Sequence, residues 1–515
     1  MTLKREVYQA LEDIVGPDNA SMEPAILDSY TKVWGVAIVT GKPRLPRPGA
    51  VVLPESTEEV QMIVKACNRY KVKFKALSTG WIFAISPGAD GLQIDLRRMN
   101  RILEINEKNM YAVVEPYVIG AQLQAELMKK GLTCNVIGAG SNTTMLAPAK
   151  CSGAGHSGVT TSYDCRNQLA VEWVLPTGDV LRLGSLGGEA GWFYGDGPGP
   201  SLRGVTRGNL GAYGGIGIFT KAAIKLYHWP GPRVPVIEGV SPYYRFKASE
   251  NLKLHCISFS SWERCSEALH KISESEMALV FARLAPWMLA FNIGTNNQEA
   301  VELLSKIEKS LNGRIAWVII IAGDTKNEFE YKEKVLKKIK EETVGESFDL
   351  IEDSDIADGL LWRILRVTRS NSETFRASGV YFGTMAGTDA LLPAVQHMAH
   401  DTEIKKRLIA EGLIINDGGD NNWGVCFEGG HFYHLEQLVL HTETPESIDG
   451  MRFLGKKSRV IAVEKHYPLH TGTGDEAANF YGPHVNNYQL WARKIKKAFD
   501  PNLVSESTFY FTPDE

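Results

Sequence analysis

The sequence predicts an α+β protein of two domains followed by a C-terminal segment. Residues 51–150 alternate short apolar strands with helices, residues 169–226 are rich in strands, and a His-Trp-Pro-Gly-Pro motif at 228–232 interrupts this pattern. Proline and glycine cluster there at the point where periodic structure stops, which indicates a domain boundary. We therefore expect a first domain at 1–232, a second α+β domain at 233–464 and a C-terminal segment at 465–515.

The first domain opens with elements whose apolar residues recur at regular spacing. Apolar side chains in the helix expected at 57–72 fall three or four residues apart, and Ser56 with Glu59 forms a capping box at its start. A second helix is expected at 119–131. The strands expected around these helices lie at 51–54, 74–77, 91–96 and 111–116.

Later elements follow the same reasoning. A Thr-Gly-Asp turn joins two apolar strands within 169–184, and a further strand at 218–226 follows a glycine cluster. Beyond the boundary, helices are expected at 298–311 and 329–342. A last helix is expected at 486–500.

Composition restricts the class of protein. The chain has 515 residues, 44% hydrophobic and 23% charged, and a formal net charge of -4, which offers no electrostatic footprint for nucleic acid. Residues 1–16 resemble an amphipathic helix more than a signal peptide, and the apolar run 316–321 is far too short to span a membrane. Seven cysteines without a C-x-x-C pair predict neither a disulfide framework nor a zinc ribbon. We expect a cytoplasmic protein with reduced thiols.

Three turns rich in glycine follow strands in the first domain, at 76–80, 138–158 and 211–217. Glycine lets backbone N–H groups approach a diphosphate closely, and Ser and Thr add hydroxyl donors. None of the turns matches the Rossmann G-x-G-x-x-G or the Walker G-x-x-x-x-G-K pattern. Each alone is typical of a β-turn, whereas together they favour a phosphate cradle.

Residues 47–80, 96–118 and 171–185 resemble, in order and spacing, the flavoprotein fold shared by vanillyl-alcohol oxidase, p-cresol methylhydroxylase, glycolate oxidase subunits and alkyl-dihydroxyacetonephosphate synthase. The resemblance implies a two-subdomain FAD-binding domain of the p-cresol methylhydroxylase (PCMH) type and an α+β cap domain with an antiparallel sheet. It also implies that residues 465–515 pack back on the FAD domain. The motif YGDGPGP at 194–200 is most similar to the phenol-oxidising branch of the family.

The resemblance also assigns contacts to the cofactor, FAD. In the family, the loop matching Leu77–Trp81 wraps the pyrophosphate, the loop matching Met145–Gly158 runs along the isoalloxazine and ribityl chain, and the segment matching Gly217–Thr220 contacts the adenine side. Because residues 78–82 contain no histidine, a covalent flavin bond at that loop is excluded, while one from the cap domain stays open. The implied FAD contacts are Leu77, Ser78, Thr79, Gly80, Trp81, Pro116, Met145, Ser152, Gly153, His156, Gly158, Gly217 and Ile218.

Several positions depart from the family pattern on the substrate side. Tyr117 stands where the family has glycine, Trp81 stands about where the phenol oxidases keep a phenolate-binding tyrosine, and their Tyr-Arg pair appears here as Glu476-Ala477. The phenolate clamp of the phenol oxidases is therefore not intact.

A cluster of histidines in the second domain supplies catalytic candidates. If 431–441 forms a strand, His434 and Glu436 share one face, while His431, Tyr433 and His441 point to the other. The alternative is a cap-domain strand with buried, hydrogen-bonded histidines. We expect no metal; were one bound, its ligands would be His434, Glu436 and His431, which joins the pair only if Gly429 and Gly430 keep it in a turn.

Arginines supply a second group of candidates. Arg363, Arg366 and Arg369 recur three apart on one helical face, a pattern more often found on a solvated surface. Arg376 is the preferred member because it precedes a predicted strand instead of lying on that helix. Asp417 and Asp420 are interpreted as turn residues.

The resulting functional hypothesis is hydride transfer from a small alcohol-bearing or phenolic aromatic substrate to flavin N5. Its catalytic candidates are His434, Tyr433, His431, Glu476 and Arg376. Two alternatives stay open: a metal-assisted 2-hydroxyacid dehydrogenase of the same superfamily, and a non-catalytic flavin electron-transfer subunit. The resemblance further suggests a homodimer and an electron-transfer protein as acceptor, with no nucleic-acid partner.

Overall fold

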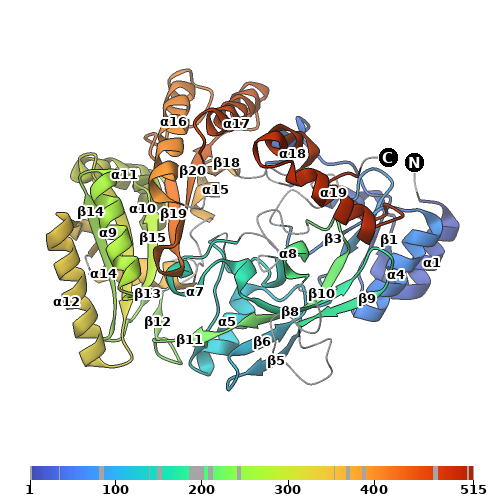
Figure 1. Ribbon diagram of the computed structural model, residues 1–515, viewed down its shortest axis with the longest axis horizontal. Coiled ribbons are helices and arrows are strands. Elements are labelled where there is room, and N and C mark those ends of the chain that lie inside the picture. The colour runs from blue at the N-terminus through green and yellow to red at the C-terminus, as the bar shows by residue number, and fades with distance from the viewer. Residues whose placement is uncertain are drawn as a thin grey trace.

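The computed structural model describes the chain except for residues 1–2, 34, 81–85, 139, 148–152, 185–201, 207–212, 240–244, 353, 367–371, 386–389, 468–473, 507–509 and 514–515. The chain forms two α+β lobes that lie side by side (Figure 1). No helix among the described residues is long and apolar enough to cross a membrane.

The first lobe begins with a small mixed sheet of strand order β1-β2-β4-β3, in which β2, β4 and β3 run parallel. Helices α1 and α4 pack their apolar faces against this sheet. As predicted, the Ser56 hydroxyl accepts a hydrogen bond from the Glu59 N–H at the start of α4. The elements are α1 (Arg5–Val15), β1 (Ala20–Ser21), α2 (Pro24–Ser29), α3 (Val36–Thr40), β2 (Ala50–Val52), α4 (Thr57–Tyr70), β3 (Phe74–Leu77) and β4 (Leu92–Asp95).

A second, antiparallel sheet completes this lobe, with strand order β5-β6-β10-β8-β9. Buried side chains of α5 cover it, and a two-stranded ribbon of β7 and β11 lies beyond. Its elements are β5 (Ile102–Asn106), β6 (Tyr111–Val114), α5 (Gly120–Lys129), β7 (Leu132–Thr133), α7 (Gly158–Thr161), β8 (Gln168–Val174), β9 (Val180–Leu183), α8 (Arg203–Thr206), β10 (Ile218–Lys225) and β11 (Tyr227–His228).

The second lobe is a seven-stranded antiparallel sheet of order β17-β14-β16-β15-β19-β20-β18. Its strands are β14 (Leu252–Phe259), β15 (Ala278–Leu284), β16 (Ile315–Ala322), β17 (Glu346–Ser347), β18 (Tyr381–Met385), β19 (Asn422–Phe427) and β20 (Phe432–Leu440). A small hairpin of β12 (Ile237–Glu238) and β13 (Arg245–Phe246) precedes them.

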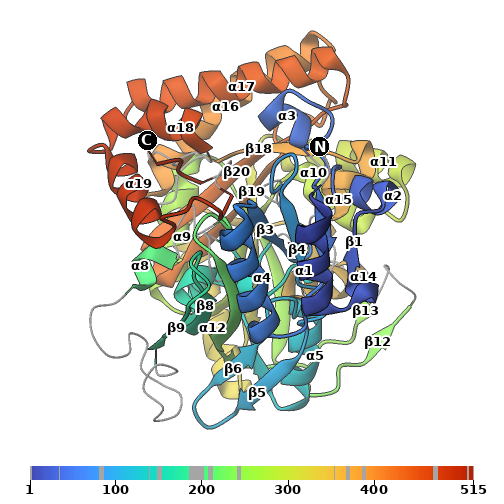
Figure 2. The same cartoon turned by 90° about the vertical axis from the view of Figure 1, so that its right-hand side faces the viewer.

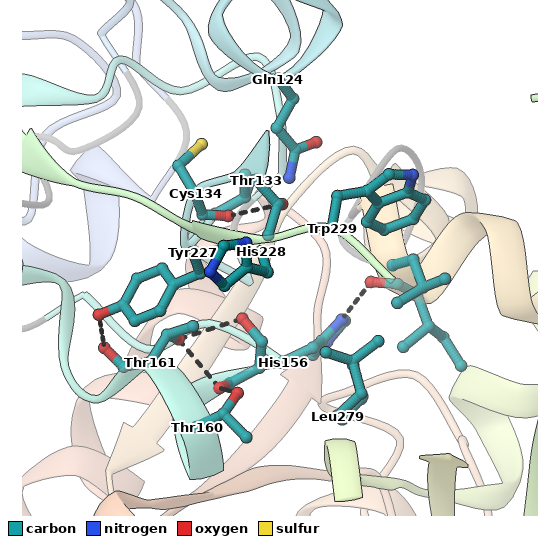
Figure 3. A pocket seen from close by; sticks show the side chains of 15 residues that line it. Gln124, Thr133, Cys134, His156, Thr160, Thr161, Tyr227, His228, Trp229 and Leu279 are labelled. Carbon is teal, nitrogen blue, oxygen red and sulfur yellow. Dashed lines mark hydrogen bonds between the residues drawn. The ribbon is translucent and has the colours of Figure 1, made fainter. Parts of the chain in front are cut away.

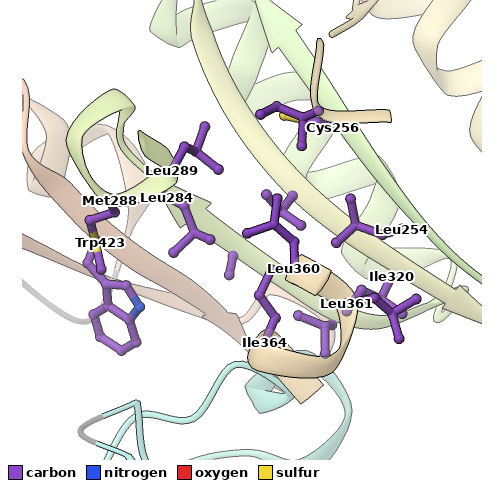
Figure 4. Packing of buried hydrophobic residues seen from close by; sticks show 14 of the residues in the cluster. Leu254, Cys256, Leu284, Met288, Leu289, Ile320, Leu360, Leu361, Ile364 and Trp423 are labelled. Atoms are coloured by element: carbon purple, nitrogen blue, oxygen red, sulfur yellow. The ribbon is translucent and has the colours of Figure 1, made fainter. Parts of the chain in front are cut away.

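Helices cover both faces of this sheet. One face packs on α9 (Trp262–Glu274), α12 (Lys326–Thr343) and α16 (Leu391–Ala410). The other packs on α10 (Pro286–Ile293), α11 (Asn297–Leu311), α13 (Asp349–Glu352) and α14 (Ser354–Arg366), in a core that reaches Trp423 (Figure 4). Helices α15 (Ser372–Ser378) and α17 (Pro445–Glu464) complete the lobe, and α17 runs across one end of the molecule beside α16 (Figure 2).

The C-terminal segment returns to the first lobe. It contains α18 (Gly474–Tyr481) and α19 (Tyr488–Phe499), and Phe74 in β3 then exchanges backbone hydrogen bonds with Val504 and Glu506. The two-subdomain arrangement with an antiparallel cap sheet confirms the predicted fold class. The boundaries at 232 and 464 stay our proposal for dividing the chain.

A buried ammonium group holds the C-terminal segment against the first lobe. The Lys496 Nζ donates to the carbonyls of Gly215 and Ser505 and to the Asp500 carboxylate at 2.5–2.6 Å, and Lys496 and Asp500 are at most 1% exposed. Each carbonyl and the carboxylate would otherwise be buried without this donor, which is costly.

Replacing Lys496 by alanine should lower the free energy of unfolding by about 3 kcal/mol, because Asp500 would keep a buried charge without its cation. Urea unfolding of the FAD-loaded protein measures the change. Lys494→Ala is the control, since Lys494 is exposed on the same helix over the Trp491 ring and should cost less than about 1 kcal/mol. Equal stabilities of the two variants would contradict the role given to Lys496.

Candidate functional site

The first glycine-bearing turn continues directly from the carboxyl end of β3. Leu77 is buried, Ser78, Thr79 and Gly80 are half-buried, and Gly80 has a φ of 69° in the left-handed region that favours glycine. No described residue accepts a hydrogen bond from the backbone N–H of Ser78, Thr79 or Gly80. Among the described residues these three N–H donors have no acceptor, and the Ser78 and Thr79 hydroxyls lie beside them, which fits a diphosphate of the expected cofactor. Trp81 lies outside the described residues.

Two further segments lie beside this turn. The Ser78 hydroxyl is 3.4 Å from that of Thr144, and the Met145 N–H donates to the Val118 carbonyl at 2.8 Å. Pro116 is buried just after β6. Residues that the sequence assigned to the cofactor from three separate stretches are thus brought together.

Gly217 stands where the chain enters β10. Its φ is 102°, and a Cβ there would meet the Val174 carbonyl and the Trp173 ring, so only glycine fits. Its N–H donates to the Ser505 hydroxyl at 3.0 Å. The C-terminal segment therefore supports Gly217 and Ile218, the segment assigned to the adenine side.

The glycines at 153–158 serve close packing in this structure. A Cβ on Gly153 would meet the Asp164 carboxylate, and one on Gly158 would lie 2.6 Å from the Phe427 ring of the cap domain. These two glycines let the loop approach its neighbours. Ser152 lies outside the described residues.

Asp164 is a buried acid under this loop. Its Oδ1 accepts a hydrogen bond from the Asn135 amide, its Oδ2 has no partner among the described residues, and a cavity of about 10 Å³ adjoins it. Burial raises the pKa of Asp164 to about 7, and the bond from Asn135 opposes that rise only in part. Near neutral pH, a large fraction of this carboxyl is therefore protonated.

A series of buried rings runs from the FAD-side loop into the cap sheet. Trp423 in β19 donates its indole N–H to the His156 Nε2 at 3.0 Å, and the His156 Nδ1 lies 3.2 Å from the Ile364 carbonyl. The Trp423 ring meets His434 edge to face, with 5.5 Å between ring centroids. Burial lowers the pKa of His156 to about 4, so the imidazole is neutral and accepts the indole proton.

The cap strand β20 separates the histidine cluster as the periodicity predicts. His434 is 3% exposed and its Nε2 lies 3.9 Å from the Glu436 Oε2, on the face that carries Trp423. Tyr433 lies on the opposite face, with its hydroxyl 3.2 Å from the His270 Nδ1 of α9. His431 is exposed beside the Glu428–Gly430 turn. No group of three His, Cys, Asp or Glu side chains in the described part of the chain is placed to hold a metal ion.

Two other predicted residues lie elsewhere. The Glu476 side chain is 89% exposed and faces Arg459 at 3.6 Å. Arg376 lies on a separate short helix, α15, ahead of strand β18 and not on the helix that carries Arg363, as expected. Its guanidinium donates to the Phe291 and Gly294 carbonyls, which caps the end of α10.

Of the row Arg363, Arg366 and Arg369, Arg363 is buried, the Arg366 side chain is not described, and Arg369 lies outside the described residues. Asp417 is more than a turn residue. It forms a fully buried ion pair with Lys405 at 2.6 Å.

Sequence reasoning missed Trp423, Asn135 and Asp164. Asp164 has one signal in hindsight: an acid between Tyr163 and Cys165, in a stretch otherwise without charge from 151 to 163. Trp423 lies in a plain apolar strand, so its partner His156 could be found only from the fold.

Comparison with known proteins agrees with this geometry. Residues 48–184 match the model of an FAD binding domain. The chain is 28% identical over 249 residues to the 4-cresol dehydrogenase [hydroxylating] flavoprotein subunit of Pseudomonas putida, covering 45% of this chain and 44% of that protein. It is 26% identical over 235 residues to a probable mitochondrial D-lactate dehydrogenase of Danio rerio, again covering 45% and 44%. The chain thus matches less than half the length of these relatives.

The similarity of fold extends over the whole chain. The crystal structure of p-cresol methylhydroxylase with substrate bound superposes with a TM-score of 0.77 at 18% identity, covering 99% of this chain and 98% of that one. The fold and the matched domain define an FAD-binding protein with a cap domain. Residues 48–184 therefore form an FAD-binding domain, FAD is the cofactor, and the whole chain has the fold of p-cresol methylhydroxylase.

The depressed pKa of His156 makes the stability of the protein fall in acid. The unfolded histidine takes up a proton near pH 6.5, whereas the folded one resists protonation until about pH 4, so stability is lost as the pH falls between these values. Wild type should lose about 2 kcal/mol relative to His156→Gln between pH 7 and pH 5. Urea titrations at both pH values measure the free energy of unfolding, and His270→Asn, at an exposed position, is the control. A difference between wild type and His156→Gln that does not change with pH would contradict the prediction.

The titration of Asp164 should have the opposite effect on the pH dependence of stability. The folded carboxyl holds its proton up to about pH 7 while the unfolded one loses it near pH 3.8, so stability falls as the pH rises through this window. Asp164→Asn, which imitates the protonated acid, should gain about 2 kcal/mol on wild type between pH 5 and pH 7. The same urea titrations test this prediction. If Asp164→Asn instead loses stability relative to wild type between pH 5 and pH 7, the carboxyl is ionised in the folded protein.

Proposed function

We propose that this chain is an FAD-dependent oxidoreductase that oxidises a small alcohol-bearing or phenolic aromatic substrate. The observation that carries the proposal is the buried ring series His156, Trp423 and His434, which leads from the FAD-side loop to a histidine with an adjacent carboxylate. The relatives named above, a cresol dehydrogenase subunit and a probable lactate dehydrogenase, support oxidation at a CH–OH or benzylic carbon.

FAD, when bound, supplies the hydride acceptor, and Ser78, Thr79 and Gly80 would hold its diphosphate through their backbone N–H groups and hydroxyls. The chain's own residues then have to position the substrate and move a proton. His434 is the preferred base, because an imidazole 3.9 Å from Glu436 can take a proton from a substrate hydroxyl while the carboxylate stabilises the resulting cation. The edge of Trp423 keeps the His434 ring oriented.

The other candidates rank below His434 in this proposal. Tyr433 faces α9 and its hydroxyl contacts His270, Glu476 is exposed, and Arg376 caps α10. His431 is placed for a role only near the surface. We also propose that an electron-transfer protein accepts the electrons from the flavin and that the chain forms a homodimer.

A second candidate function is a 2-hydroxyacid dehydrogenase, which the similarity to the probable D-lactate dehydrogenase favours. The two functions differ in substrate charge and in the use of a metal ion. Treatment with a chelator separates them, since loss of activity favours the hydroxyacid function and indifference favours the phenol-type one.

Anaerobic reduction of the bound flavin identifies the substrate class. A panel of 4-alkylphenols, aromatic alcohols and 2-hydroxyacids is mixed with the FAD-loaded protein, and we expect a phenol or aromatic alcohol to bleach the flavin absorbance. Bleaching by 2-hydroxyacids alone would replace the first proposal by the second. If no compound bleaches the flavin while dithionite does, the chain is a non-catalytic flavin subunit.

With the best substrate of that panel, His434→Asn should lower kcat by about 10²- to 10⁴-fold while FAD content stays unchanged, because the variant lacks the base and retains the fold. Stopped-flow flavin reduction measures the chemical step. The matched control is His270→Asn, an exposed histidine of α9 on the opposite side of the same sheet. Flavin reduction by His434→Asn at the wild-type rate would exclude His434 as the base.

A further inference from the structure

A cavity of about 140 Å³ lies where the ribbon β7–β11 and helix α5 of the FAD lobe meet β15 and α14 of the cap (Figure 3). Its rim carries Thr160 and His228, which are exposed, and its inner end carries Gln124 and His156, which are buried. None of the residues assigned above to the diphosphate or the adenine side lines it. The cavity is therefore separate from those parts of the cofactor site.

The walls are apolar or already satisfied. Both ring nitrogens of His156 are engaged by Trp423 and Ile364. The Tyr227 hydroxyl donates to the Thr161 carbonyl, and the Trp229 indole donates to the Pro232 carbonyl. These aromatic rings therefore offer the cavity mainly their carbon surfaces, as do the aliphatic residues Val136, Leu279, Val280, Ile364 and Leu365.

Gln124 is the exception. It is 2% exposed, its Oε1 has no hydrogen-bond partner, and its amide is directed at the cavity in Figure 3. A buried amide oxygen without a partner costs free energy. A ligand that donates a hydrogen bond to this oxygen would recover that free energy, and an acceptor beside the donor would pair with the amide nitrogen.

The volume of the cavity and the charges of its lining residues restrict the class of ligand further. A cavity of about 150 Å³ holds a benzene ring, and this one is nearly as large. No Lys, Arg, Asp or Glu is among its lining residues, and the exposed His228 lies at the rim, so a charged group at the inner end would lie without a counter-ion. We propose that this cavity binds a small neutral aromatic carboxamide, whose amide pairs with Gln124 and whose ring lies between Tyr227, Trp229 and Leu279.

The proposal is tested with benzamide on the FAD-loaded full chain by isothermal titration calorimetry. We expect saturable binding of one equivalent, with benzoate at pH 7 and toluene each binding at least about tenfold more weakly, because one lacks a neutral donor group and the other lacks any partner for Gln124. Absence of saturable benzamide binding would overturn the proposal. Toluene binding as tightly as benzamide would reduce the site to an apolar void and also overturn it.

Three variants locate the bound benzamide. Gln124→Leu should weaken benzamide at least about tenfold and leave toluene unweakened, whereas Gln122→Leu, the same change at an exposed position of α5, should alter neither. Leu279→Trp should abolish binding of both by filling the cavity. Because the wild-type ligand panel needs no variant, the proposal stays testable if Gln124→Leu fails to fold.

His434→Asn distinguishes this site from the proposed catalytic one. Benzamide affinity should be unchanged in that variant, and loss of benzamide affinity there would place benzamide at the catalytic site and overturn the inference. The calorimetric result does not depend on turnover, so failure of the proposed oxidase activity and failure of this site are separate observations.

Discussion

The hydrogen bond from Trp423 to His156 is the constraint on which the junction between the two lobes depends. An indole N–H and an imidazole are both costly to bury alone, and each satisfies the other at 3.0 Å. The bond requires a neutral histidine, and burial supplies this by lowering its pKa to about 4. From this point Trp423 orients His434 on one side, while the His156 ring forms a wall of the interlobe cavity on the other.

Much of the fold could be predicted because its elements are encoded locally. The spacing of Val60, Ile63, Val64 and Cys67 and the cap at Ser56 define α4 without reference to any other part of the chain. The cap-sheet order could not be derived in this way. Strands β15 and β19 pair across more than 130 residues, and such a pairing leaves no periodic signal in either strand.

In the candidate site, too, local features could be predicted from the sequence and long-range contacts could not. Strand periodicity correctly predicted that His434 and Glu436 share a face and that Tyr433 does not. It could not tell which face looks toward the FAD lobe, and so Tyr433 and His434 entered the hypothesis as equals. The contact of Arg376 with α10 and the pairing of Asp417 with Lys405 could not be predicted, because both depend on tertiary packing that leaves no local pattern.

The return of the C-terminal segment affects the order of biosynthesis. Strand β3, an edge strand that leads into the turn at Ser78–Gly80, receives its outer backbone partners from Val504 and Glu506. At about 5–20 residues per second, a ribosome needs roughly 20 to 90 seconds to pass from Phe74 to Glu506. Until then the edge is open to wrong pairing. Capture of the dinucleotide is therefore a late event, and a nascent chain stalled before residue 504 should depend on chaperones.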